Sequence, residues 1–109
     1  MPYNEDIEKR ILNIVKDWDD TNLKKMFGGI CHLIRGNMFC GVYKDFLILR
    51  LGEEKAENAM KLRFVGPFDI TGRPMRGWVM VEEQGFSTEG SLRNWLDQAR
   101  AFASSLPPK

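Results

Sequence analysis

The side chains best suited to bind a ligand are two arginines in the stretch DITGRPMRGWVMV. Arg73 and Arg76 flank a proline, and a planar guanidinium can hold a carboxylate, a phosphate or an acidic partner through two parallel hydrogen bonds. A tight turn explains the glycines and the proline of this stretch. The arginines have two interpretations, since they could also form surface ion pairs with Asp69 or with Glu82 and Glu83.

The sequence offers no recognisable set of catalytic residues. His32 is the single histidine, and a zinc site would need further ligands at a characteristic spacing, such as a Cys-x-x-Cys motif, which is absent. Its neighbour Cys31 should point to the opposite face of a strand. We therefore expect no catalytic residue and no enzyme. An enzyme of undetected type stays open as an alternative, and it would need a polar pocket around Asp69, Arg73 and Arg50.

Two further motifs fail as metal or phosphate sites. The acidic run DWDDTN resembles the start of a calcium loop at Asp17, but such a loop needs glycine at its sixth position and a carboxylate at its twelfth. Those positions hold Asn22 and Gly28. Gly28 and Gly29 precede a strand and lack the motif of a phosphate-binding loop. We therefore expect neither a metal nor a cofactor.

Three helices must position these side chains. Residues 4–18 place their aliphatic groups on one stripe of an amphipathic helix, for which Asn4 is a suitable N-cap. A second stripe runs from about 89 to 105 and stops before Pro107. Between them, the segment EEKAENAMK after Gly52 predicts a short helix with acidic residues in its first turn.

Strands are predicted between the helices. Aromatic and aliphatic residues separated by turn signals indicate three antiparallel strands, near 28–35, 38–43 and 46–51. Gly36 and Asn37 suit a two-residue type II′ turn between the first two strands. Lys44 and Asp45 form the next turn.

A second hairpin completes the predicted sheet. Its strands lie at 66–70 and 76–82, on either side of Thr71-Gly72-Arg73-Pro74. The order α-β-β-β-α-β-β-α describes an α+β fold, in which a mainly antiparallel five-stranded sheet packs with helices. No repeat or linker interrupts the pattern, so residues 1–109 should form a single domain.

The predicted turns decide which side chains share a face of the sheet. The core side should contain Cys31, Leu33, Met38, Cys40, Val42, Leu47, Leu49 and Leu51. The second side should contain His32, Ile34, Phe39, Tyr43, Phe46, Ile48 and Arg50, and it is apolar enough that a helix or a partner should cover part of it. Cys31 would then lie opposite Val42. Cys40 would lie opposite Leu33, so the thiols would be diagonal neighbours, too far apart for an unstrained disulfide, and should stay free.

The composition is that of a globular domain with balanced charge. Hydrophobic residues make up 43% and charged residues 28% of the 109 positions, which supports one self-sufficient core. Sixteen basic and fifteen acidic residues give a net charge of +1, so nucleic-acid binding would need a local basic patch. Two cysteines do not make a disulfide framework, and we find no leader or membrane-spanning run, so we expect a cytoplasmic protein.

Four stretches resemble the amino-terminal domain of the TfoX/Sxy proteins: KKMFGGI, MFCGVYKDFLILRLG, PFDITGRPMRGWVMV and LRNWLDQARAFASSLPPK. They occur in order and cover essentially the whole chain. The resemblance implies the α+β fold and brings no catalytic residue, because the family has no known catalytic motif. Its members include bacterial regulators of natural competence that act with a cyclic-AMP-responsive transcription activator. Those regulators carry a second, carboxy-terminal domain, and we expect this chain to be a stand-alone amino-terminal domain.

The leading hypothesis is a bacterial interaction module, an accessory factor in transcription or competence-type regulation that binds a protein partner such as a transcription activator. Its predicted binding surface consists of Phe39, Tyr43, Phe46, Arg50, Arg73 and Arg76. The alternative is direct DNA binding through a local basic patch of Lys24, Lys25, Arg63, Arg73 and Arg76. A homodimer could close the apolar face or a sheet edge.

Overall fold

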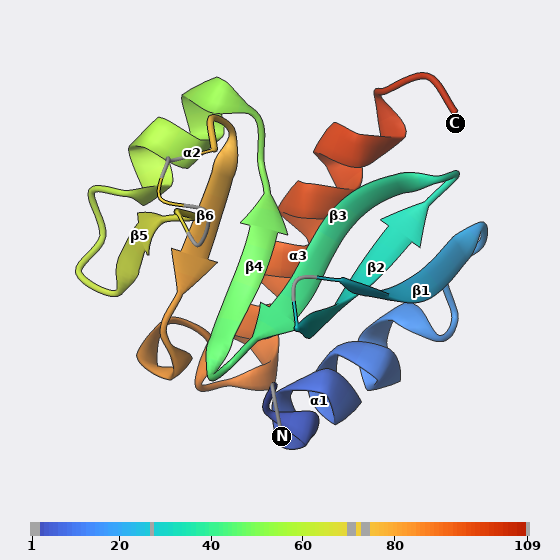
Figure 1. The fold of residues 1–109 in the computed structure, drawn as a ribbon, viewed down its shortest axis with the longest axis horizontal. Helices are drawn as coiled ribbons and strands as arrows, with labels where there is room; N and C mark the ends of the chain where they lie inside the picture. Colours follow the sequence, from blue (N-terminus) through green and yellow to red (C-terminus); the bar gives the residue numbers. More distant parts are fainter. Residues whose placement is uncertain (1–2, 27, 70–71, 73–74, 109) are drawn as a thin grey trace.

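The computed structural model describes residues 3–26, 28–69, 72 and 75–108. Over these residues one sheet is accompanied by α-helices and a short 3₁₀ helix, which confirms the predicted α+β class (Figure 1). In chain order the elements are α1 (Glu5–Val15), β1 (Thr21–Met26), β2 (Gly29–Ile34), β3 (Asn37–Tyr43), β4 (Phe46–Arg50), α2 (Glu53–Ala59), β5 (Val65–Pro67), β6 (Trp78–Val81), η1 (Glu83–Phe86) and α3 (Glu89–Ser104).

The described strands form a six-stranded sheet in the order β1-β2-β3-β4-β6-β5, with antiparallel neighbours throughout. The predicted count of five strands is wrong because β1 was missed. Its sequence, TNLKKM, lacks the apolar alternation that indicates a strand, and Leu23 is 51% exposed. β1 is an edge strand held by backbone pairing with β2, so periodicity could not reveal it.

Both long helices begin at the capping residues that favour them. Oδ1 of Asn4 accepts hydrogen bonds from the backbone N–H groups of Asp6 (2.9 Å) and Ile7 (3.2 Å), as the sequence predicts. α3 begins with a reciprocal capping box between Thr88 and Ser91. Within the described chain, no helix is long and apolar enough to cross a membrane.

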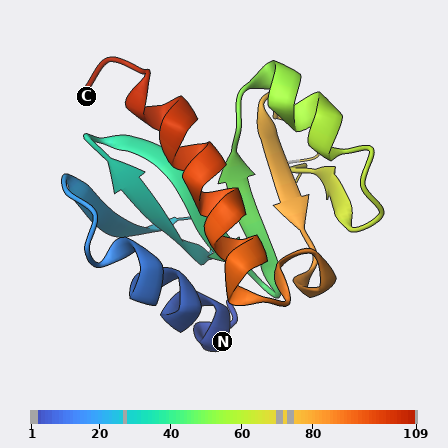
Figure 2. The ribbon, with the colours of Figure 1, turned by 180° about the vertical axis from the view of Figure 1, so that it is seen from behind.

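The main core lies between one face of the sheet and the helices. Figure 2 shows α1 and α3 lying over this face. The helices contribute aliphatic side chains and Trp95, and strands β2 to β6 contribute the residues that face the helices. The largest fully buried members include Phe39, Phe86, Leu47, Leu49, Leu92 and Leu96. Burial of this set supplies most of the driving force for folding.

The turn between β2 and β3 differs from the prediction by one residue. The central residues are Arg35 and Gly36, both with positive φ (51° and 84°), which is typical of a type I′ turn, and Ile34 pairs with Asn37. The one-residue shift inverts β2. His32 and Ile34 therefore face the helices, whereas Cys31 and Leu33 face the opposite side, contrary to the prediction.

A β-bulge at Phe39 then changes the alternation again. His32 lies opposite Cys40 and Leu33 opposite Met38, which leaves Phe39 as the extra residue of β3. Phe39 is 0% exposed in the main core, and its ring centroid lies 5.9 Å from that of Trp18 and 6.5 Å from that of His32. Its predicted place on the second face is wrong, and so is the predicted place of Met38 in the core.

From Cys40 to the end of β4, each side chain lies on the face of the sheet that the sequence predicted. Tyr43 pairs with Phe46 across the expected turn at Lys44 and Asp45, so the leucines of β4 point into the core and Ile48 points away. The partners predicted for the cysteines are wrong: Cys31 lies opposite Gly41, and Cys40 lies opposite His32. Both thiols are free and buried, as predicted.

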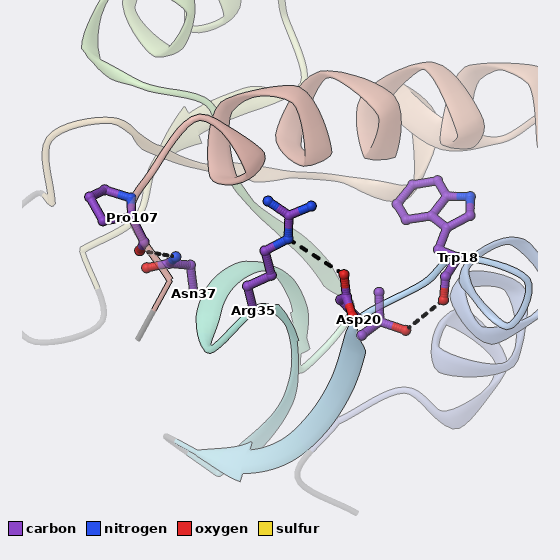
Figure 3. A network of polar contacts seen from close by, with 6 residues as sticks. Trp18, Asp20, Arg35, Asn37 and Pro107 are labelled. Atoms are coloured by element: carbon purple, nitrogen blue, oxygen red, sulfur yellow. Dashed lines mark hydrogen bonds and ion pairs between the residues drawn. The ribbon is translucent and has the colours of Figure 1, made fainter.

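Polar contacts connect the β2–β3 turn to distant parts of the chain (Figure 3). The backbone N–H of Arg35 donates to the carbonyl of Asp20 (3.0 Å), and Nε of Arg35 lies 3.5 Å from Oδ2 of Asp20. Nδ2 of Asn37 donates to the carbonyl of Pro107 (2.9 Å). The turn therefore contacts both the α1–β1 connection and the segment after α3.

Candidate functional site

The sheet face opposite α1 and α3 carries a second apolar cluster, which we call the open face. Its members are Met38, Tyr43, Phe46, Ile48, Trp78 and Met80 from the strands, with Phe68 and Met75 from the β5–β6 connection. Ile48, Phe68 and Trp78 are buried, and the others are half-buried around them. Figure 1 faces this side and shows no helix, among the described residues, in front of β3 and β4. The open face is thus apolar and only partly covered.

A stacked arginine lies at one end of the open face and three carboxylates at the other, where Nζ of Lys44 also lies 5.4 Å from the ring centroid of Tyr43. At one end, the guanidinium of Arg50 lies 5.5 Å from the ring centroid of Trp78 and 5.7 Å from that of Phe102. Stacking on two rings holds this cation in place. At the other end, Phe46 lines a shallow hollow together with the acidic residues Asp45, Glu82 and Glu83.

The structure assembles only part of the predicted binding surface. Tyr43 and Phe46 lie on the side that the sequence predicted. Arg50 pairs with Trp78 of the same side, although its guanidinium also contacts Phe102 of α3. Phe39 is in the main core and cannot contact a partner. Arg73 lies outside the described residues.

Arg76, the second arginine of the opening motif, lies beside α2. Its side chain is 87% exposed, with Nη1 4.0 Å from Oε1 of Glu53, a carboxylate that the sequence did not suggest as its partner. Arg76 also lines a cleft of ≈ 110 Å³ together with Met75 and Trp78, so it lies beside the Arg50 end of the open face. An ion pair this exposed contributes little to stability, and the guanidinium stays accessible to a partner.

The residues predicted to contact DNA do not form one patch. Lys24 and Lys25 belong to β1, and Arg63 lies between α2 and β5. β1 and β5 are the opposite edges of the sheet, roughly 24 Å apart at a typical strand spacing. Arg76 lies near the β5 side, and Arg73 is outside the described residues. Direct DNA binding stays a prediction, and a duplex would have to contact these residues at separate points of the surface.

A buried polar pair connects α1 to the sheet, and the sequence interpretation missed it. Nε2 of His32 lies 2.8 Å from Oε1 of Glu8, and the two residues are 2% and 7% exposed. Glu8 lies next to Ile7 and three residues before Ile11, so it falls inside the apolar stripe of α1. A charged residue within such a stripe is the signal that could have revealed a buried partner.

The surroundings of this pair do not activate the nearby thiols. Burial, and secondarily the carboxylate of Glu8, raises the pKa of Cys31 to about 11 and the pKa of Cys40 well above its usual range. A thiol with a raised pKa is a poor nucleophile at neutral pH. Within the described residues, no group of three metal-ligating side chains converges. The Glu8–His32 pair is therefore best explained as a structural contact.

These thiols lead to a prediction about reactivity. At pH 8, alkylation of both cysteines should be slow in the folded protein and fast in urea, since a pKa raised from 9.0 to about 11 leaves Cys31 with about a hundredfold less thiolate. Mass spectrometry after timed iodoacetamide quenching measures this, and a Cys31→Ala variant isolates Cys40. Equal rates with and without urea would contradict it.

The same shift predicts an alkaline loss of stability. Because the pKa of Cys31 is raised in the folded state, its contribution to stability is fully present below pH 9 and is lost as the pH rises through about 11. The urea concentration at the midpoint of unfolding should therefore decrease as the pH rises from 9 to about 11. The decrease should be smaller for Cys31→Ala, which lacks this thiol.

A family model described as the TfoX N-terminal domain matches residues 13–103. The chain belongs to this family. The match confirms the resemblance predicted from the four motifs, and it includes every described strand of this TfoX N-terminal domain, the whole open face and His32, but not Glu8. Comparison with curated proteins and with solved structures gives no significant match.

Proposed function

We propose that this TfoX N-terminal domain is a non-enzymatic interaction module of the bacterial cytoplasm, which binds a protein partner through the open face. The observation that carries the proposal is the apolar layer over β3 and β4, which no described helix covers. Aromatic and methionine side chains are enriched at protein interfaces, and methionine adapts its shape to a partner. A partner would complete the burial of Tyr43, Phe46 and Met80.

Charge supports one orientation of that partner. Arg50 and Arg76 supply cations beside Trp78, whereas Asp45, Glu82 and Glu83 surround Phe46. A partner with acidic groups at one end of its apolar patch and basic groups at the other would match this polarity. Charge complementarity of this kind fixes the register of docking and rejects partners of the opposite polarity.

The biological setting follows from the family. TfoX proteins are associated with competence regulation, so we propose an accessory role in transcription, with a cyclic-AMP-responsive activator as the partner to test first. The near-neutral net charge of +1 fits a protein that binds another protein more readily than DNA.

The substitution Phe46→Glu is expected to weaken binding to the purified activator at least tenfold, because it places a charge at a half-buried apolar position of the proposed contact, beside three other carboxylates. Biolayer interferometry with cyclic AMP present measures the affinity. Leu62→Glu is the matched control, since Leu62 is 46% exposed and is not part of the open face. If the wild type binds and Phe46→Glu binds equally well, the open face is not the contact surface.

A further inference from the structure

We propose that β1 is a second docking site, an edge at which an acidic, extended segment of another protein adds as a further strand. This edge is separate from the open face, so the proposal does not depend on the proposed function. It rests on three features of the edge: its backbone, its side chains and its length.

The two edges of the sheet differ in their capacity to accept a strand. β5 has three residues and ends at Pro67, which has no N–H to donate. β1 has six residues and no proline, and β2 is its neighbour in the sheet on one side. Among the described residues, no strand pairs with the other side of β1. A long unpaired edge is a template for strand addition.

The hydrogen-bond pattern identifies the backbone groups that a guest strand would use. The N–H of Arg35 donates to the carbonyl of Asp20 (3.0 Å), one position beyond the pair between Thr21 and Ile34. Hydrogen-bonded pairs alternate with non-bonded pairs in an antiparallel ladder. The residues of β1 that direct their N–H and C=O groups outward are therefore Thr21, Leu23 and Lys25.

The side chains of β1 define the chemistry of the guest. Leu23 is 51% exposed, and both following lysines are exposed without an ion-pair partner among the described residues. Lys24 lies opposite Cys31 and Lys25 opposite Ile30, so one cation projects on each side of the sheet. Carboxylates opposite these lysines and an apolar residue opposite Leu23 would give favourable cross-strand pairs.

The same lysines disfavour a second copy of this chain as the guest. Outward residues can pair only with outward residues, so two antiparallel copies of β1 could place Leu23 opposite Leu23, with each Lys24 diagonal to the other Lys24. The other central register places Leu23 opposite Lys25, with the two Lys24 residues directly opposite each other. Like charges at cross-strand positions destabilise pairing, and edge lysines commonly prevent it. An acidic segment meets no such repulsion.

The test is a titration of the ¹⁵N-labelled domain with a capped Thr-Val-Glu-Glu-Val-Thr peptide, whose consecutive glutamates can lie opposite both lysines, followed by amide hydrogen exchange. The proposal predicts that exchange of the outward amides of Thr21, Leu23 and Lys25 slows about tenfold or more, while Asn22 and Lys24, already bonded to β2, change little. Peptide-induced shifts without this protection would overturn strand addition. Protection that depends on domain concentration rather than on peptide would show self-pairing, which also contradicts the proposal.

Two variants make the test specific. Leu23→Pro removes an outward N–H without removing a bond to β2, and it should abolish protection by the peptide. The pair Lys24→Glu and Lys25→Glu should switch the preference to a Thr-Val-Lys-Lys-Val-Thr peptide. The matched control, Lys55→Glu with Lys61→Glu, makes the same charge change away from β1 and should leave the preference unchanged. An unaltered preference in the β1 charge-reversed protein would refute the proposal even if Leu23→Pro does not fold.

Discussion

The substitution Phe39→Ala is expected to lower the free energy of unfolding by about 3–5 kcal/mol, the usual effect of emptying a buried phenylalanine site. Phe39 is fully buried against Trp18 and His32, because the bulge in β3 turns it towards the helices. The regular alternation of a strand would instead place Phe39 on the partner-binding face, where its loss would affect binding and hardly affect stability.

Urea unfolding followed by tryptophan fluorescence measures the Phe39 effect. Phe46→Ala is the matched control, since Phe46 is a half-buried phenylalanine of the open face, and it should cost about 1 kcal/mol. Phe39→Leu retains most of the buried volume and should fall between the two if Phe39→Ala is too unstable to purify. Equal losses for Phe39→Ala and Phe46→Ala would show that the bulge is wrongly placed.

Separating Glu8 from His32 should be the other costly change. Glu8→Leu alone, or His32→Leu alone, is expected to destabilise the domain by about 3 kcal/mol, because the remaining buried polar group loses its partner. Oε2 of Glu8 already lacks a hydrogen-bond partner among the described residues. If His32 is replaced, neither carboxylate oxygen of Glu8 therefore keeps a hydrogen bond to a side chain that the structure describes. The double variant should recover most of the loss, since it removes both polar groups at once.

A double-mutant cycle tests this pair directly. The four proteins are unfolded in urea at one pH, and the coupling energy is the difference between the double variant and the sum of the singles. Strong coupling is expected, because the two side chains are in direct contact. If the loss of unfolding free energy in the double variant equalled the sum of the losses in the two single variants, Glu8 and His32 would not interact in solution.

The helices of this domain could be predicted from the sequence because their apolar stripes and caps are local signals. Asn4 caps α1 as expected, and the predicted stripe near the end of the chain is α3. β1 could not be predicted in this way, because an exposed edge strand buries no face and its residues carry no alternation. What fixes β1 is the backbone pairing with β2, which is a long-range property.

The residues of the open face could be predicted only on strands whose connecting turn was placed correctly. Lys44 and Asp45 set the register of β3 and β4 correctly, which placed Tyr43 and Phe46 on the right side. The turn before β3 was off by one residue, and the bulge compensated for the shift beyond Phe39. A bulge leaves no clear sequence signal when its extra residue is as apolar as its neighbours.

Two other features depend on contacts between distant segments. Trp78 and Met80 join the open face because β6 pairs with β4, across a connection that contains α2 and β5. Glu8 contacts His32 because α1 lies over the face of the sheet on which His32 projects. Local patterns identify each of these residues as apolar or charged, but they do not show which residues come together.

The most direct test of the proposed function is an NMR titration of the ¹⁵N-labelled domain with the purified cyclic-AMP-bound activator, and separately with a DNA duplex at low and moderate salt. The proposal predicts that the activator shifts or broadens the amide signals of Tyr43, Phe46 and Met80, and that DNA leaves them unchanged at both salt concentrations. It would be contradicted if the activator left the open face unaffected while DNA produced salt-sensitive shifts at Arg63 and Arg76 or at Lys24 and Lys25.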